Sequence, residues 1–522
     1  MKILRKLPIG IQDFIKLRED TNIYVDKTAL IYKMVNENSA YFLSRPRRFG
    51  KSLLISTLAA YFLGKKEYFK GLAIEELEED WIEYPVVRID LNAKEYTEGK
   101  AYLIDMLKTQ IINCFNKYEL THTKEDAPSL FAELLEKLHK KTGQRAVVLI
   151  DEYDKPLLAT LDKPELLEQM KSVLKPFFGV LKSADEHLKF LLLTGVTKFG
   201  QVSVFSDLNQ LNDISLHPDY ATICGLTLNE VCENFAPEIE ILASKDGLSH
   251  SECLEKIKLW YNGYKFEEDA EGVFNPFSTL KLFHSNKFEN HWFQTGTPTF
   301  LVELLKESDF DLRNIDGVEL GADAFANYKA NADRPLPVLY QSGYLTIKSY
   351  DKELRLYTLG YPNFEVKYSL LGFFSENYTS LDEDQSGLNI ARFYQDLQKG
   401  NVDDFMVRVQ AFFGKIPYEL NSQNEKHYQM VLYIIFTLLG QYTKAEVRSS
   451  FGRADLIVEN KDFVYIFEFK LFETAENALL QIEEKGYAIP YLADSRKIVK
   501  VGAEFSAATK NVAKWVVAPN SD

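Results

Sequence analysis

The sequence predicts an α/β protein with a parallel sheet flanked by helices, a helical, winged-helix-like middle region, and a smaller C-terminal α/β domain. Short apolar runs alternate with helical patterns over residues 41–220, helical periodicity takes over from 221 to 350, and two strand-like runs lie near the C-terminus. A chain of 522 residues is too long for one hydrophobic core. We therefore expect three domains, at 1–220, 221–380 and 381–522.

Four apolar runs predict the strands of the first domain. Each run is short, rich in β-branched or aromatic residues, and followed by a polar or glycine-containing turn. The runs occupy residues 40–44, 85–91, 145–151 and 189–196. Helical patterns between them indicate crossover connections, so the strands are expected to be parallel.

The middle region combines helices with one predicted hairpin. Strand-like residues 343–349 and 354–360 flank a turn at Asp351 and Lys352. Two aromatic turns, at 260–266 and 274–283, are interpreted as hydrophobic packing around Gly263 and Pro276 in preference to a ligand pocket. The polar, acidic run at 380–387 predicts a linker and a domain boundary.

Composition and charge exclude several classes of protein. The hydrophobic share of 46% and the charged share of 26% are those of a folded chain. A net charge of −15 repels phosphate backbones, so a nucleic-acid site must be a local basic surface. The four cysteines form no CxxC pair, which argues against disulfides and structural zinc. We expect no signal peptide, no membrane partner and a cytoplasmic location.

A modified phosphate loop follows the first predicted strand. Gly50, Lys51 and Ser52 stand where a turn passes into a helix, and the backbone N–H groups of a helix N-terminus bind anions. We expect Lys51 to reach the β- and γ-phosphates of ATP and Ser52 to ligate Mg²⁺. Arg48 and Phe49 complete the predicted nucleotide-binding loop, although Arg45 stands where the P-loop consensus has glycine.

An acid pair ends a later strand, as hydrolysis of a nucleotide requires. Asp151 is expected to hold the magnesium shell, and Glu152 to polarise the attacking water. Thr194 ends the next strand, where it would either sense the γ-phosphate or cap a turn. Together these features predict a P-loop NTPase.

The same residues carry a resemblance to a known family. The segments 7–35, 42–54, 147–157 and 194–209 resemble the AAA-ATPase-like proteins found widely in bacteria, whose loop is itself of the RPRRFGKS type. The resemblance covers roughly residues 4–280. It also marks a second set as characteristic, without a chemical role that the sequence can assign: Gly10, Asp13, Tyr24, Asp26 and Lys27.

A second chemical site is predicted near the C-terminus. Glu468 and Lys470 are two residues apart on a predicted strand, so they project to one face, while Phe467 and Phe469 point to the other. Asp455, on the preceding strand, and Glu468 are expected to bind Mg²⁺. Lys470 would then position a water or stabilise charge that develops on phosphorus.

This arrangement is similar to the PD-(D/E)xK nuclease superfamily, with Ala454 in place of the proline of the motif. By that resemblance, Glu425 matches the acid of an N-terminal helix, a further metal ligand, and Gln481 matches a polar helix residue downstream. Domains of the AAA-ATPase-like kind are often followed by such a nuclease-like domain in this family.

Two hypotheses from different classes stay open. In the first, the protein is an ATPase whose nucleotide state controls a magnesium-dependent nuclease, with DNA expected before RNA and with self-assembly left open. In the second, it is a non-enzymatic switch, in which ATP gates binding of a partner or of nucleic acid through an inactive nuclease-like domain. A transposase-like action would use the same residues.

Overall fold

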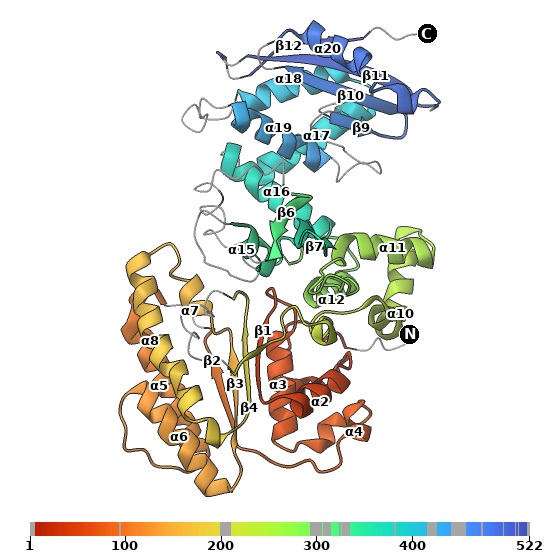
Figure 1. Cartoon of the computed structure of the whole chain (residues 1–522). Helices are drawn as coiled ribbons and strands as arrows, with labels where there is room; N and C mark the ends of the chain where they lie inside the picture. Colours follow the sequence, from red (N-terminus) through yellow and green to blue (C-terminus); the bar gives the residue numbers. More distant parts are fainter. Residues whose placement is uncertain are drawn as a thin grey trace. The chain divides into compact units, whose positions relative to one another are not determined.

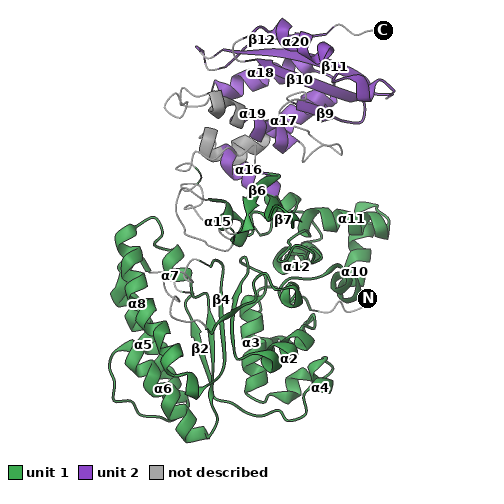
Figure 2. Ribbon diagram, in the orientation of Figure 1, with its two compact units in different colours: residues 1–310, 316–366 green, residues 311–315, 367–522 purple. Residues whose placement is uncertain are grey.

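The computed structural model describes residues 6–92, 96–198, 210–292, 305, 315–322, 325, 335–379, 383–414, 425–439, 456–470, 473–493, 495–506, 508–509 and 511–518. The chain divides into two compact units (Figure 2). Unit 1 comprises residues 1–310 and 316–366, and unit 2 comprises residues 311–315 and 367–522. No helix in the described ranges is long and apolar enough to cross a membrane.

A parallel sheet forms the centre of unit 1, as the apolar runs predict. Its strand order is β2-β3-β4-β1-β5. The strands are β1 (Ala40–Ser44), β2 (Val86–Asp90), β3 (Ala146–Asp151), β4 (Leu188–Gly195) and β5 (Asn212–Asp213). Because β4 lies between β1 and β3, the ends of three strands converge at one edge, where the predicted nucleotide site belongs.

Helices cover both faces of this sheet (Figure 1). One layer contains α5 (Lys100–Lys117), α6 (Ala127–Thr142) and α8 (Pro164–Ser183), and the other contains α1 (Phe14–Glu19), α2 (Thr28–Glu37), α3 (Lys51–Phe62) and α4 (Ile74–Leu77). A short helix, α7 (Lys155–Leu158), follows β3. Burial on both faces explains why β1 and β3 read as continuous apolar runs.

Helices and a small sheet complete unit 1. The helices are α10 (Leu228–Asp246), α11 (His250–Tyr261), α12 (Pro276–Ser285) and α15 (Pro335–Gln341). Thr227 and Glu230 form a capping box at the start of α10, and Ser249 and Glu252 form one at the start of α11. The predicted hairpin is present as β7 (Thr346–Asp351) and β8 (Leu356–Gly360), and β6 (Val318–Gly321) pairs with β8.

Unit 2 packs helices around a mixed sheet. Its strand order is β12-β11-β10-β9, and only β10 and β11 are parallel. The strands are β9 (Leu456–Glu459), β10 (Phe463–Lys470), β11 (Lys497–Ser506) and β12 (Asn511–Val517). The helices are α16 (Phe364–Thr379), α17 (Glu383–Gln398), α18 (Val402–Phe413), α19 (Glu425–Leu439) and α20 (Ala475–Glu484).

Part of the acidic run at 380–387, where we expected a linker, is helical, and residues 380–382 lie outside the described residues. Helix α17 begins at Glu383, so residues 383–387 are helical, and the division into units falls after Val366. Acidic residues suit the first turn of a helix because its N-terminus carries partial positive charge. Polarity alone therefore did not separate a helix start from a linker at this position. The expected domain boundaries near residues 220 and 380 stay predictions.

Candidate functional sites

The phosphate loop connects β1 with α3. Gly50, which precedes the helix, has a φ of 93°, a left-handed conformation that favours glycine. Arg48 also lies in the left-handed region, with a φ of 67°. These two residues turn the chain so that α3 starts at Lys51, with Ser52 in its first turn. The structure thus places Gly50, Lys51 and Ser52 at a helix N-terminus, the position that anion binding requires.

Lys51 is held inside this loop. Its Nζ donates hydrogen bonds to the backbone oxygens of Arg45, at 2.9 Å, and Pro46, at 3.1 Å. Only 5% of the residue is exposed. The ammonium group therefore has hydrogen-bond acceptors within the loop, and it would have to break these hydrogen bonds to reach a phosphate.

The predicted acids lie at the neighbouring strand ends. Thr194 Oγ1, on β4, donates a 2.6 Å hydrogen bond to Asp151 Oδ1, on β3. This contact joins two of the predicted residues directly, and Thr194 faces the acid instead of capping a turn. Strands β1 and β3 are separated by β4, so the ends of these two strands lie roughly 10 Å apart across the sheet.

Glu152 occupies a constrained position beside this pair. Its φ of 51° is unusual for a residue other than glycine. Burial raises the pKa of Glu152, and the Lys51 ammonium opposes this shift. The effect of Lys51 on this carboxyl group indicates that the loop and the acid pair share one electrostatic environment.

Asp154 is a buried acid that the sequence analysis did not single out. Its carboxylate accepts hydrogen bonds from the backbone N–H groups of Val196 and Thr197 and from Thr197 Oγ1. It therefore fixes the chain just after β4, close to Thr194. The last acid of the run DEYD is the signal that could have found it.

Arg45, which stands where the P-loop consensus has glycine, has a structural role in the loop. Its guanidinium donates to the backbone oxygens of Ser44, Ser215 and Tyr220 and lies 4.1 Å from the centre of the Phe266 ring. The residue is 1% exposed. The sequence analysis missed this role, because contacts between residues 170 positions apart leave no local pattern.

The other predicted loop residues contact the helical part of unit 1. The Arg48 guanidinium lies 5.0 Å from the ring centre of Phe277, on α12. The Phe49 ring packs edge-on against Tyr264, at 4.8 Å, and Phe266, at 5.4 Å. The first aromatic turn thus packs as predicted, but against the phosphate loop.

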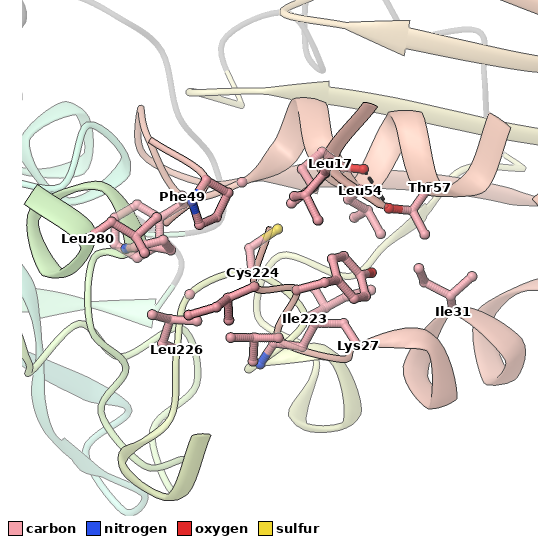
Figure 3. Close-up of a pocket in the computed structure, with 18 of the residues that line it drawn as sticks. Leu17, Lys27, Ile31, Phe49, Leu54, Thr57, Ile223, Cys224, Leu226 and Leu280 are labelled. Atoms are coloured by element: carbon pink, nitrogen blue, oxygen red, sulfur yellow. Dashed lines mark hydrogen bonds between the residues drawn. The ribbon is translucent and has the colours of Figure 1, made fainter. Parts of the chain in front are cut away.

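An apolar cavity of about 100 Å³ opens beside the loop (Figure 3). Gly50, Leu53 and Leu54 line one wall, and Cys224 and Leu226 line another. Figure 3 shows that the labelled side chains surround a common space and come from segments far apart in the sequence. Pro276 and Leu280, from the second aromatic turn, also line it. Packing alone, our interpretation of that turn, was therefore incomplete.

The N-terminal segment closes this cavity and gives the family-characteristic residues positions. Lys27 Nζ contacts both carboxylate oxygens of Glu230, at 2.5 and 2.7 Å. Tyr24 lines the wall, and desolvation strongly raises its pKa. Asp13 accepts a hydrogen bond from the Lys16 N–H at the start of α1. Asp26 accepts one from the Ala73 N–H.

The second site lies on β10, where α20 covers one face. Gln481 donates to Glu468 Oε1 through Nε2 and accepts from Lys470 Nζ through Oε1. Lys470 Nζ lies 3.5 Å from Glu468 Oε1. Glu468 and Lys470 thus share a face with Gln481, whereas the Phe469 ring packs on Phe436, of α19. This alternation follows the prediction.

Two predicted metal ligands fall outside what the structure describes. Asp455 precedes the first described residue of β9, and the side chain of Glu425, the first residue of α19, is not described. Among the described residues, no group of three or more His, Cys, Asp or Glu side chains is arranged to hold a metal ion. Mg²⁺ needs fewer protein ligands, because it keeps several waters and binds through one or two carboxylates with phosphate oxygens. The oxygen donors Ser52 and Asp151 at one site, and Glu468 at the other, fit this preference.

Comparisons with known proteins assign both parts of the chain. Residues 8–205 match the family described as predicted AAA-ATPase, and residues 423–515 match the PD-(D/E)XK nuclease superfamily. An uncharacterized protein in the vnfD 5′ region of Azotobacter chroococcum mcd 1 is 37% identical over 530 residues, covering 98% of this chain and 99% of that one. The solved structure of the Aeropyrum pernix ORC2 protein, in ADPNP-ADP complexes, has a TM-score of 0.24 at 11% identity and covers 69% of this chain and 92% of that one.

Proposed function

Because the chain belongs to the AAA-ATPase-like family and carries a C-terminal domain of the PD-(D/E)XK nuclease superfamily, we propose that it binds and hydrolyses ATP and that its nucleotide state controls a magnesium-dependent nuclease. The substrate of the nuclease is nucleic acid, with DNA expected before RNA. One observation carries the ATP part: the apolar cavity and the phosphate loop share Gly50, at the start of α3.

Gly50 belongs to both the phosphate loop and the cavity, so the two features together fix the orientation of the nucleotide. The phosphates bind at the N-terminus of α3, where free backbone N–H groups and Lys51 supply positive charge. The base enters the apolar cavity, whose wall of Leu53, Leu54 and Leu226 suits a flat aromatic ring. Binding therefore draws on both the N-terminal segment and the helical part of unit 1.

Hydrolysis requires a base beside the acid that supports the metal. Bound Mg²⁺ neutralises charge that develops on the phosphates. Asp151 and Ser52 are the residues that would hold it. Glu152 orients the attacking water and accepts its proton, and Thr194 fixes Asp151 through its 2.6 Å hydrogen bond. Because burial raises the pKa of Glu152, we expect ATP hydrolysis to decline in mild acid, as this base becomes protonated.

Cleavage of nucleic acid uses the residues of β10 and α20. Glu468 and Asp455 would hold the metal, and Lys470 would stabilise charge on the phosphodiester. Gln481 contacts both Glu468 and Lys470, so it keeps the carboxylate and the ammonium group on one face of the strand. The acidic net charge of −15 implies that other substrate contacts are local.

One observation favours the second candidate, a switch without cleavage. The Glu468 carboxylate is 3% exposed and already contacts Gln481 and Lys470. A carboxylate satisfied in this way gains less from a metal ion. In that case the C-terminal domain would hold nucleic acid or a partner without cutting it.

Two substitutions separate these functions. We expect Lys51→Ala to weaken ATP binding at least about tenfold, because the loop loses the ammonium group that would contact the phosphates, while the nuclease residues stay intact. We expect Lys470→Ala to leave ATP binding unchanged and to reduce cleavage of plasmid and single-stranded DNA at least about 100-fold. Calorimetry with ATP and gel assays with Mg²⁺ or Mn²⁺ measure the two effects.

The matched controls are two lysines that pair with exposed acids. Lys140→Ala breaks an ion pair with Glu136 on α6. Lys500→Ala, on β11 beside β10, breaks an ion pair with Glu483 on α20. Both should keep ATP binding and cleavage. Full activity of Lys51→Ala and Lys470→Ala would refute the proposal, and DNA binding without cleavage in every metal would favour the switch.

A further inference from the structure

The phosphate loop packs closely against other residues of unit 1. Phe49 packs between Tyr264 and Phe266, and Gly343 approaches Pro46 so closely that a Cβ there would lie 2.8 Å from the proline Cβ. The loop therefore cannot change its shape without changing its contacts with Tyr264, Phe266 and Gly343.

Trp292 makes a directional contact with this loop. Its Nε1–H donates a 3.1 Å hydrogen bond to the backbone oxygen of Arg47, and its ring packs against Tyr344 with centroids 5.2 Å apart. Trp292 is 6% exposed, so the indole is fixed by its surroundings. It touches the loop one residue after the carbonyl groups that hold Lys51.

The backbone of Trp292 makes a second hydrogen bond, to a residue outside the phosphate loop. Its N–H donates a 2.6 Å hydrogen bond to Glu365 Oε1. Glu365 is fully buried and lies in the first turn of α16, which starts at Phe364 in unit 1 and continues into residues of unit 2. A single residue thus joins the phosphate loop to the start of the helix that leads to the nuclease unit.

Phosphate binding would change the contacts of Lys51, and this change can reach Trp292 through the loop backbone. In the structure, its ammonium group is bonded to the carbonyl groups of Arg45 and Pro46. A bound phosphate competes for the same group, and those carbonyl groups then lose their donor. Arg45 is held by three other backbone oxygens, so the response falls on Pro46 and Arg47, next to the Trp292 contact.

We propose that Trp292 and Glu365 are positioning residues that link the phosphate loop to the first turn of α16, so that phosphate binding at the loop stabilises this helix. The inference rests on the proposed ATP site and deepens it, since it names how nucleotide occupancy reaches the helix that enters unit 2. Neither residue takes part in the chemistry. Their role is to couple two elements through one side-chain and one backbone hydrogen bond.

Hydrogen–deuterium exchange of the full chain tests the link. We expect AMP-PNP with Mg²⁺ to slow exchange in peptides from residues 364–379 at least about threefold in the wild type. Trp292→Phe keeps an aromatic ring but removes the Nε1–H donor, so it should bind nucleotide without slowing exchange in α16. Glu365→Gln keeps an acceptor for the Trp292 N–H and should behave as the wild type.

A matched control makes the same substitution elsewhere. Trp260→Phe alters a ring that packs on Phe288, and it should leave the response of α16 intact. Calorimetry on the same samples records nucleotide binding. Bound nucleotide without slower exchange in the wild type, or an unchanged response in Trp292→Phe, overturns the link alone. Absence of nucleotide binding in the wild type overturns the proposed ATP site and, with it, the link.

Discussion

Glu365 is a carboxyl group that the fold buries among rings and hydroxyl groups. Burial raises the pKa of Glu365 to about 7. The hydrogen bond that the carboxylate accepts from the Trp292 N–H acts in the opposite direction and lowers the pKa, but burial has the larger effect. Two neighbours stay uncharged over the neutral range, because burial raises the pKa of Tyr264 and lowers that of His291. The Ser278 side chain and the His291 backbone act against the rise in the pKa of Glu365 to a smaller extent than burial acts for it. One proton at Glu365 therefore has a measurable effect on stability.

Protonation of Glu365 makes the free energy of unfolding depend on pH. The folded protein holds the proton up to about pH 7, whereas an unfolded glutamic acid loses it near 4.5. The free energy of unfolding thus falls as pH rises through this window, by at most about 3 kcal/mol. In Glu365→Gln this loss is absent, so the variant should gain on the wild type between pH 5 and pH 8.

Urea unfolding at several pH values measures this difference. Glu255→Gln, on an exposed part of α11, is the control and should show no comparable gain. A constant difference between Glu365→Gln and the wild type across this range would contradict the assignment of a raised pKa.

At the scale of elements, α10 and the N-terminal segment meet at one ion pair. Lys27 and Glu230 have side-chain exposures of 12% and 21%, so solvent screens this pair less than the exposed pairs of the surface. Glu230 has a second task, because it also accepts a hydrogen bond from the Thr227 N–H in the capping box of α10. The pair therefore ties a helix start to the segment that closes the cavity.

A double-mutant cycle separates the two tasks of Glu230. Glu230→Gln removes the charge but retains a side chain that can complete the capping box. Combined with Lys27→Met, it should show a coupling of about 1 kcal/mol in the unfolding of unit 1. We also expect each single variant to weaken ATP binding, since the cavity wall is less firmly closed. Additive effects on unfolding would show that the contact contributes nothing.

At the scale of the whole molecule, the division into two units predicts two unfolding transitions. A ligand stabilises the unit that binds it, by about 2.7 kcal/mol at a free concentration of 100 times its Kd. AMP-PNP with Mg²⁺ should therefore raise the melting temperature of unit 1 more than that of unit 2. Scanning calorimetry measures both, with Lys51→Ala as the variant that should not respond. An equal rise of both transitions would contradict the assignment of the nucleotide to unit 1.

Much of the fold could be predicted from local pattern. Fully buried strands read as apolar runs, and β1 to β4 and the hairpin of β7 and β8 were found in this way. The alternation of Glu468 and Lys470 with Phe467 and Phe469 predicted which side chains share a face of β10. Residues 383–387 of the expected linker are helical, because an acidic run also suits a helix start, as α17 shows.

The candidate nucleotide site was predicted by residue type more fully than by contact. The sequence placed Lys51, Asp151, Glu152 and Thr194 at a loop and at strand ends, since parallel strands expose their ends at one edge. It could not pair Thr194 with Asp151, which depends on β4 lying beside β3.

By itself, the amino-acid sequence determined the family and the parallel sheet and predicted candidate residues for both sites, because these patterns depend on neighbours close in the chain. Only the tertiary structure decided that Arg45 is a buried structural residue, that Lys27 meets Glu230, and that Trp292 joins Arg47 to Glu365. Each of these contacts joins residues more than 70 positions apart. The physical reason is that such partners are chosen by packing, which no local periodicity records.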